Sequence, residues 1–438
     1  MIYKLILFNL ILFIFTACGK DTKDIDRHYL SCHEINKSIN LNKETLQHID
    51  IDAPTGLNIL VSNSPKSRNE TTSFDKDGLY TLLKTEYLWA DETPRTLNIT
   101  DYNEPQQLIN DAKYIKDRWS FAITHKQYNN AISQKSIGFG FRCQDIDRGC
   151  LVTYVRIDSP VDRIDLRRGD IVLKIDGQKA TQKAIYTKGQ EKGIVTLDIL
   201  RPNSNQECSG EVTPREYNYK VVESKTIKTT NNEEVGYLRI DSFLGDSKIL
   251  KQLNSAFDKF KKESIQKLII DLRYNGGGSV DLASKLLDKL VIDKRGQTQF
   301  TLTWNKNYSK NNQRYTFENA FNALDLKQII FLTTKHTASA SELIISALKA
   351  YLPEENIVII GDRTDGKPVG MVGQSDGSYY YFLINFLVKN ALGFYDYFDG
   401  LPVTSGCNIV DDPFHEMGDR DEAMLKSALL YIDRGSCQ

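Results

Sequence analysis

The chain contains 438 residues, 40% of them hydrophobic, so it can bury more than one core, and its length predicts two or three domains. A formal net charge of -1 gives no electrostatic reason to expect a nucleic-acid partner. The sequence has neither a Cys-x-x-Cys pair nor a His-Glu-x-x-His motif, and therefore gives no support for a metal site.

The N-terminal segment has the pattern of an export signal. A single cation precedes an apolar run from Leu5 to Ala17, which ends at Cys18. This run of about 13 residues is too short to span a bilayer, which needs about 20. The small residues before Cys18 resemble a bacterial lipoprotein signal. We therefore expect residues 1–17 to be removed and Cys18 to anchor an exported protein in the cell envelope, at the outer membrane. The alternative is an ordinary cleaved signal with a chance cysteine.

Two regions follow this signal. Residues 18–76 are polar, and we expect them to form a tether and an N-terminal region without a clear pattern. Residues 77–134 predict a small helical domain, because apolar residues from Leu79 to Tyr87 recur at helical spacing and Pro105–Lys113 predicts a second helix. We interpret the aromatic residues of this domain as packing residues.

Residues 135–223 resemble a PDZ domain. The alternation Gly138-Phe139-Gly140-Phe141 comes first, and Arg168-Gly169-Asp170 with Ile175-Asp176-Gly177 matches the central signature. The glycines would let backbone N–H groups converge on a carboxylate, while the adjoining strand edge accepts an extended peptide. Alone, the alternation would indicate only a closely packed strand. With the downstream signature, we predict a peptide-binding groove at Gly138, Phe139, Gly140 and Phe141.

Residues 224–438 alternate strand and helix patterns, which predicts an α/β core. The strand pattern Leu268–Leu272 leads into the glycine run Gly276–Gly278, and a helix is predicted over Val280–Val291. Glycines allow the main chain to approach a reacting carbonyl where a Cβ atom would clash. The alternatives are a flexible turn or a phosphate loop, although the spacing fits neither of the common phosphate-binding glycine motifs.

Ser339 and Lys367 are predicted to lie at the ends of neighbouring elements. The apolar run Ile329–Leu332 predicts a buried strand, and a helical pattern follows over Glu342–Tyr351, so Ser339 falls at a strand-to-helix turn. Unpaired N–H groups at such a turn suit a serine nucleophile and its oxyanion. A buried, neutral Lys367 could be its base. From these residues alone, however, a capping serine and a solvated Gly-Lys turn are favoured.

Three motifs together reverse that interpretation. Asp271–Gly278 reads D-L-R-x-N-G-G-G, Ser339–Glu342 reads S-A-S-E and Thr364–Lys367 reads T-x-G-K; in this order they resemble the carboxyl-terminal processing (tail-specific) serine peptidases. The resemblance implies that Ser339 is the nucleophile and Lys367 its base, with an oxyanion hole formed by the N–H groups of Gly277 and Ala340. It also implies an α/β multidomain architecture, in which a small helical domain and a PDZ domain accompany a crotonase-like ββα-spiral peptidase core.

Two features depart from the pattern of that family. The segment between the serine and the lysine is longer than expected, with Leu352–Glu354 as the expected insertion. Ala350 and Met371 stand where the family often has an acidic residue and a glutamine, and we expect Gln374 to take over the supporting role of the glutamine. These departures bear on the rate and on the orientation of the lysine rather than on the type of reaction.

Six cysteines remain besides Cys18, and an even number permits disulfides in an exported protein. Cys143 and Cys150 are close enough in sequence to link a hairpin, and Cys407 with Cys437 could tie the C-terminal tail. Six free thiols are the alternative.

The sequence therefore predicts a serine endopeptidase that cleaves unfolded or tail-presented polypeptides in the cell envelope, without a cofactor or a metal. Its expected partners are substrates with exposed C-termini or unfolded segments, and the membrane through Cys18, but no nucleic acid. The alternative, favoured by Ala350 and Met371, is an inactive peptide-binding envelope scaffold. A crotonase-type acyl-CoA enzyme fits export poorly, because its cofactor is cytosolic. We interpret His336 as structural, since a histidine in the turn of Ser339 cannot easily reach the serine oxygen.

Overall fold

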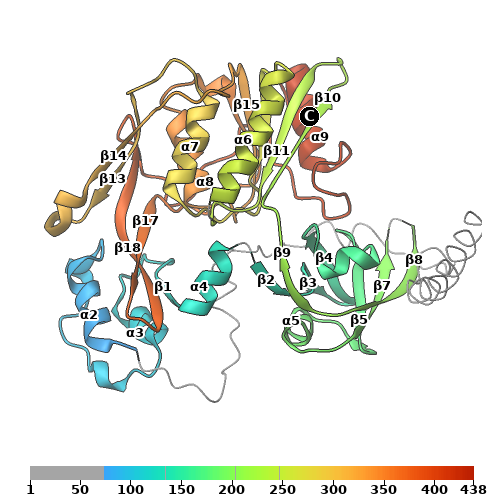
Figure 1. The fold of residues 1–438 in the computed structure, drawn as a ribbon. Helices are drawn as coiled ribbons and strands as arrows, with labels where there is room; N and C mark the ends of the chain where they lie inside the picture. The colour runs from blue at the N-terminus through green and yellow to red at the C-terminus, as the bar shows by residue number, and fades with distance from the viewer. Residues whose placement is uncertain (1–73, 134, 203, 246) are drawn as a thin grey trace, which may run out of the picture. The chain divides into compact units, whose positions relative to one another are not determined.

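The computed structural model describes residues 74–438 apart from residues 134, 203 and 246 (Figure 1). The predicted signal, Cys18 and most of the predicted tether lie outside the described residues. The described chain divides into two compact units. The first comprises Ser136–Tyr219 and Pro413–Glu416, and the second comprises residues 74–135, Lys220–Asp412 and Met417–Gln438. In the part described, no helix has both the length and the apolar character needed to cross a membrane.

The first unit is built on an antiparallel sheet with the strand order β3-β4-β5-β7-β8, in which β6 also pairs with β5. Its strands are β3 (Phe141–Ile146), β4 (Gly149–Val155), β5 (Ile171–Ile175), β6 (Gln178–Lys179), β7 (Val195–Arg201) and β8 (Gln206–Val212). The pair β2 (Lys135–Gly138) and β9 (Arg215–Asn218) and the helix α5 (Gln182–Gln190) accompany this sheet. Alternate side chains, among them Val152, Val172 and Ile199, are buried in one core. The disulfide Cys143–Cys150 joins β3 to β4 and confirms the predicted hairpin link.

The second unit contains a sheet with the strand order β10-β11-β12-β15-β16, parallel except for β10. Its strands are β10 (Val222–Lys228), β11 (Glu234–Ile240), β12 (Lys267–Asp271), β15 (Gln328–Thr333) and β16 (Ile357–Gly361). Helices α6 (Ser247–Lys262), α7 (Val280–Leu290) and α8 (Ala340–Leu348) lie on one side of it, and α9 (Ala423–Arg434) lies on the other (Figure 1). Because both faces are covered, β12 and β15 are continuous apolar runs rather than alternating ones.

The C-terminal tail is fixed to this sheet. Met424, Leu425 and Leu429 of α9 share a core with Ile330 and Leu332 of β15. The disulfide Cys407–Cys437 closes the tail, as predicted. The mixed α/β class predicted from the sequence is therefore confirmed.

A second, antiparallel sheet of this unit has the strand order β1-β18-β13-β14, and β17 also pairs with β18. Its strands are β1 (Phe121–Thr124), β13 (Thr298–Trp304), β14 (Gln313–Thr316), β17 (Val369–Ser375) and β18 (Tyr379–Asn390). The helices α2 (Lys76–Thr85), α3 (Pro105–Ala112) and α4 (His125–Ile132) belong to the segment predicted as a small helical domain. Leu83 of α2 and Leu108 of α3 share a hydrophobic core with Leu383 and Ile384 of β18. This shared core joins the N-terminal helices to the strands that follow Lys367.

We expect replacement of Cys407 and Cys437 by serine to lower the free energy of unfolding of the second unit by about 2–4 kcal/mol, since this cross-link spans a sequence separation of 30. The Cys143→Ser/Cys150→Ser pair is the comparison. Its loop has a separation of only 7, so chain entropy predicts a loss smaller by about 1 kcal/mol. Calorimetry of both double variants measures the difference, and a larger loss from the shorter loop would contradict this account.

Candidate active site

Ser339 lies between β15 and α8 in a sharp, strained turn. Its backbone angles, φ 57° and ψ -116°, fall in a region that residues other than glycine rarely adopt. The turn is held by main-chain bonds: Leu343 N donates to Ser339 O at 2.8 Å, and Ala338 N donates to Asn275 O at 3.1 Å. The side chain of Ser339 is half-buried. Such a turn presents a hydroxyl above the start of a helix, as serine nucleophiles require, although Ser339 does not stand in a Gly-x-Ser-x-Gly motif.

A single buried carboxylate joins this turn to the segment that carries Lys367. Oε2 of Glu342 accepts hydrogen bonds from Ser339 N and Lys367 N, both at 2.8 Å. Oε1 accepts from Thr364 Oγ1 at 2.6 Å and from Gly366 N at 2.7 Å. Since Ser339 N and Lys367 N lie equally close to one oxygen atom, the structure brings the two predicted catalytic residues together at the level of the backbone.

The surroundings of Glu342 have opposing effects on the pKa of its carboxyl group. Its side chain is fully buried. This burial raises the pKa of Glu342 to about 7, while the four donors favour the ionised form. The carboxylate thus obtains from fixed protein groups the hydrogen bonds that it would otherwise make to water.

Lys367 lies in surroundings that favour a neutral amine. Burial lowers the pKa of the Lys367 ammonium below its ordinary value, against the raising effect of the carboxylates of Asp365, Asp117 and Glu342. The hydrogen bonds of the described residues do not include one between Ser339 Oγ and Lys367 Nζ. Catalytic hydrogen bonds of free enzymes are often long and tighten only with substrate. The candidate dyad therefore rests on the closeness of the Ser339 and Lys367 backbones and on the lowered pKa of Lys367.

The glycine loop after β12 lies against the Ser339 turn. Gly277 has φ 99°, and a Cβ atom there would lie 2.7 Å from Ser339 Cβ and 2.9 Å from Ala340 N. Only glycine therefore allows this approach. The structure brings the two predicted oxyanion donors together, and Ala340 N–H has no acceptor among the described residues. Gly277 N–H, in contrast, donates to Asn275 Oδ1 at 2.9 Å, so it must leave that oxygen before it can bind an oxyanion.

Asn275 is a supporting residue that the sequence analysis did not single out. It is fully buried, and its Nδ2 donates to Ile240 O at 2.9 Å. Its main-chain oxygen accepts from Ser341 Oγ at 3.0 Å and from Ala338 N. Asn275 thus holds the glycine loop against the segment around Ser339. The asparagine of the D-L-R-x-N-G-G-G motif was the signal that could have identified it.

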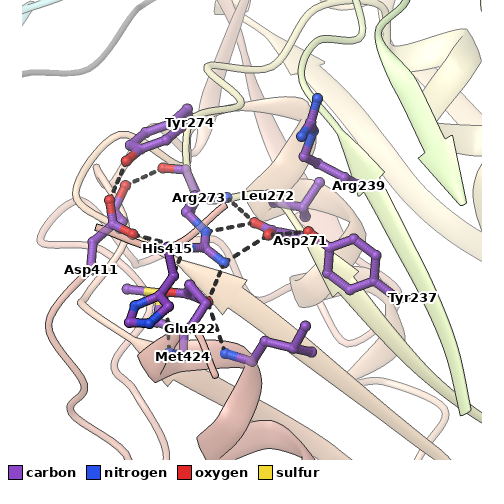
Figure 2. A network of polar contacts seen from close by, with 12 residues as sticks. Tyr237, Arg239, Asp271, Leu272, Arg273, Tyr274, Asp411, His415, Glu422 and Met424 are labelled. Atoms are coloured by element: carbon purple, nitrogen blue, oxygen red, sulfur yellow. Dashed lines mark hydrogen bonds and ion pairs between the residues drawn. The ribbon is translucent and has the colours of Figure 1, made fainter. Parts of the chain in front are cut away.

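Arg273 links the same loop to the C-terminal helix (Figure 2). Its buried guanidinium contacts three carboxylates, those of Asp271 and Glu422 at 2.9 Å and that of Asp411 at 2.7 Å. Glu422 also caps α9, because its Oε2 accepts from Leu425 N at 3.0 Å. Removing one member would leave a buried charge without its partner, so the network fixes the start of the glycine loop.

The segment after α3 reaches the turn that carries Lys367. Trp119 Nε1 donates to Asp365 Oδ2 at 2.9 Å, and Arg118 Nη2 donates to Asp365 O at 3.2 Å. Asp117 is buried and accepts from Tyr87 Oη at 2.7 Å. The aromatic residues interpreted as packing residues therefore also position the Lys367 turn, since an indole or phenol has a polar atom as well as an apolar body.

Gln374 does not take the supporting role predicted for it. It lies near the end of β17, where a rise of about 3.3 Å per residue places it about 20 Å along the chain from Lys367. Its Nε2 donates instead to Glu86 Oε2 at 3.0 Å. The prediction is wrong because it assumed that the chain turns after the lysine, whereas the chain continues as an extended strand.

The predicted groove residues lie in the first unit, from the last residue of β2 to the first residue of β3. Gly138 and Gly140 have φ angles of 125° and 92°, which favour glycine. Phe139 is buried, and its ring centroid lies 6.2 Å from that of Phe141. β3 is an edge strand of the sheet of this unit, and among the described residues no further strand pairs with its other side.

The part of the chain that the structure describes contains no group of three or more His, Cys, Asp or Glu side chains that could hold a metal ion. The arrangement around Ser339 instead combines a serine, a lysine of lowered pKa and a helix N-terminus. Together these groups can carry out nucleophilic attack on an acyl group.

Comparison with known proteins finds that two segments of the second unit match models of one peptidase family. Residues 234–378 match the model of "Peptidase family S41", and residues 76–121 match that of the "Peptidase S41 N-terminal domain". The chain is 29% identical over 265 residues to the "Probable CtpA-like serine protease" of Staphylococcus aureus (strain bovine RF122 / ET3-1), covering 59% of this chain and 50% of that protein. Its identity to the protein of the same name in Staphylococcus epidermidis is 28% over 328 residues, covering 71% and 62%. The chain thus spans about half the length of the curated relatives it matches.

A similar fold occurs in a crystal structure of a Bacteroides fragilis NCTC 9343 protein described as an S41 protease. The TM-score is 0.70 at 23% sequence identity, and the match covers 85% of this chain and 99% of that one. At this identity the likeness concerns the fold alone.

The four hydrogen bonds of Glu342 predict a large effect of Glu342→Gln. An amide has only one acceptor oxygen, so two of the four donors lose their acceptor inside the protein. We expect the free energy of unfolding in urea to fall by at least about 2 kcal/mol. Glu355→Gln, at an exposed position, is the matched control. Equal stability of the two variants would show that Glu342 does not hold the site together.

Proposed function

We propose that this chain is a serine endopeptidase with a Ser339–Lys367 dyad. The premise is that it carries the peptidase domain and the N-terminal domain of peptidase family S41, the family of the carboxyl-terminal processing peptidases. Its substrates are polypeptides that are unfolded or present a C-terminal tail. The observation that carries this proposal is the Glu342 carboxylate, which holds Ser339 N–H and Lys367 N–H on one oxygen atom. The inactive scaffold has no support, since the relatives are named as proteases.

The proposed reaction proceeds through an acyl-enzyme. Neutral Lys367 takes the proton of Ser339 Oγ, which attacks the peptide carbonyl carbon. Ala340 N–H and Gly277 N–H, the latter released from Asn275, donate to the oxyanion. The resulting ammonium of Lys367 gives its proton to the leaving amine, and water then hydrolyses the ester while Lys367 serves again as the base.

The first unit would act as a PDZ domain that binds substrate. An extended peptide would add to the open edge of β3, with its carboxylate at the glycine-rich turn of Gly138–Phe141. We also propose that the second unit has the crotonase-like ββα-spiral arrangement and that Cys18 anchors the exported chain in the envelope, at the outer membrane. The two disulfides Cys143–Cys150 and Cys407–Cys437 support export, because such bonds persist in oxidising compartments.

The dyad is tested by Ser339→Ala and Lys367→Ala. Each variant should reduce cleavage of an unfolded protein, such as reduced and alkylated casein, to below about a thousandth of the original rate, because the nucleophile or its base is missing. Lys327→Ala, which removes an exposed lysine, is the control and should retain activity. The thermal transition should change little in all three variants. Retained cleavage by either dyad variant would refute the proposal.

A second prediction concerns pH. Because the pKa of Lys367 is lowered, the neutral base becomes available below the ordinary lysine value, and kcat/KM should rise with pH along a limb whose midpoint lies below that ordinary value. Asp365→Asn removes a negative charge that stabilises the ammonium, yet it keeps an acceptor oxygen for Trp119. We expect the limb to move to lower pH in this variant.

Asp396→Asn, at an exposed position outside the groups that act on Lys367, is the control for this pH profile. Its limb should coincide with that of the unmodified protein. If the rise of kcat/KM moves to higher pH in Asp365→Asn, the proposal that neutral Lys367 is the base would be contradicted.

A further inference from the structure

Two arginines lie side by side on one face of the β3–β4 hairpin in the first unit. Arg142 is opposite Tyr154 in the register of these strands, and Arg156 N donates to Gly140 O at 2.9 Å, one step further along. Paired residues of an antiparallel ladder share a face, so Arg142 and Arg156 are diagonal neighbours on the same face. Phe141 and Cys143, which alternate with Arg142, pack toward the core on the opposite face.

Aromatic and hydroxyl groups surround this pair. The Arg156 guanidinium lies 3.8 Å from the centroid of the Tyr219 ring. A Cβ atom at Gly140 would lie 3.2 Å from Tyr217 Cζ and 2.6 Å from Ser159 Oγ, so both side chains border the same place. Ser159 is only 1% exposed, and its Oγ has no hydrogen-bond partner in the described structure.

Among the described residues this pair has no carboxylate partner, and the side chain of Arg156 hydrogen-bonds instead to that of Tyr217. Arg142 Nη1 is buried without a hydrogen-bond partner, and neither Arg142 nor Arg156 forms an ion pair within the part of the chain that the structure describes. Burial and the neighbouring Arg156 lower the pKa of Arg142. Arg201 of the same unit shows the usual arrangement, since it pairs with Asp170 at 2.9 Å and with Asp165 at 3.2 Å. Within the described residues, two adjacent and partly desolvated guanidinium groups thus lack the anion that such groups normally bind.

We propose that Arg142 and Arg156 form a carboxylate-binding site that selects an acidic side chain in a peptide bound along β3. This inference rests on the peptide-binding role proposed for the first unit. Side chains of an added strand alternate between two faces, so the residues on one face meet Phe139 and Phe141 while those between them meet the arginines. With the terminal carboxylate at Gly138–Phe141 and the last side chain on the apolar face, the next-to-last side chain lies on the arginine face.

The test measures binding of fluorescent hexapeptides to the full chain carrying Ser339→Ala, so that no peptide is cleaved. Peptides ending in Glu-Val, Gln-Val or Lys-Val are compared by fluorescence anisotropy. We expect the glutamate peptide to bind about tenfold more tightly than the glutamine peptide, and the lysine peptide to bind most weakly. Arg142→Gln or Arg156→Gln, added to Ser339→Ala, should remove the preference for glutamate.

Two further variants keep this test decisive. Arg163→Gln removes an exposed arginine of the same unit and should retain the preference. Arg142→Lys keeps the charge and should retain part of it, which separates a charge effect from a folding defect. The thermal transition of each variant is compared with that of the parent chain.

The remaining outcomes overturn the inference in distinguishable ways. Equal binding of the glutamate and glutamine peptides would refute the acidic-side-chain site and leave the peptidase proposal intact. If amidation of the C-terminus removes the dependence on Arg142, the arginines bind the terminal carboxylate and the assignment to a side chain is wrong. If none of the peptides binds, the proposed peptide-binding role of the first unit fails as well.

Discussion

The buried carboxylate of Glu342 is the interaction on which the rest of the site depends. Ser339 adopts backbone angles that are unfavourable for a serine, and such a turn persists only when its surroundings determine it. Glu342 contributes to this by binding Ser339 N–H from within the same helix and the Thr364–Lys367 segment from the other side. One side chain therefore binds both the strained turn of Ser339 and the segment that carries Lys367.

Two further layers of structure hold that arrangement in place. Asn275 holds the glycine loop through its hydrogen bond to Ile240. Arg273 links the start of the loop to Glu422 at the beginning of the C-terminal helix α9 (Figure 2). The Lys367 turn is fixed by Trp119 of the N-terminal segment, whose helices share a core with the strands that follow the lysine. The segment that matches the S41 N-terminal domain model thus ends at residues that contact the turn carrying Lys367.

The sequence predicted the elements that have a strong local signal. A strand buried on both faces is a continuous apolar run, so Ser339 could be placed at a strand-to-helix turn, and short cysteine spacing predicted the Cys143–Cys150 link. The supporting contacts could not be predicted, because they join residues distant in sequence; Trp119 and Asp365, for example, are 246 positions apart. The supporting role predicted for Gln374 was wrong for the opposite reason. Gln374 is close to Lys367 in sequence, but the extended strand β17 carries it away.

The proposed mechanism requires that an uncharged Lys367, held beside Ser339 through Glu342, activates the serine hydroxyl. The most direct measurement is the site and rate of labelling by a fluorophosphonate, followed by mass spectrometry of the peptides, in the original chain and in Lys367→Met. We expect one adduct, on Ser339, which forms at least about a hundredfold more slowly without the lysine. Labelling of another residue, or an equal rate in both chains, would contradict it.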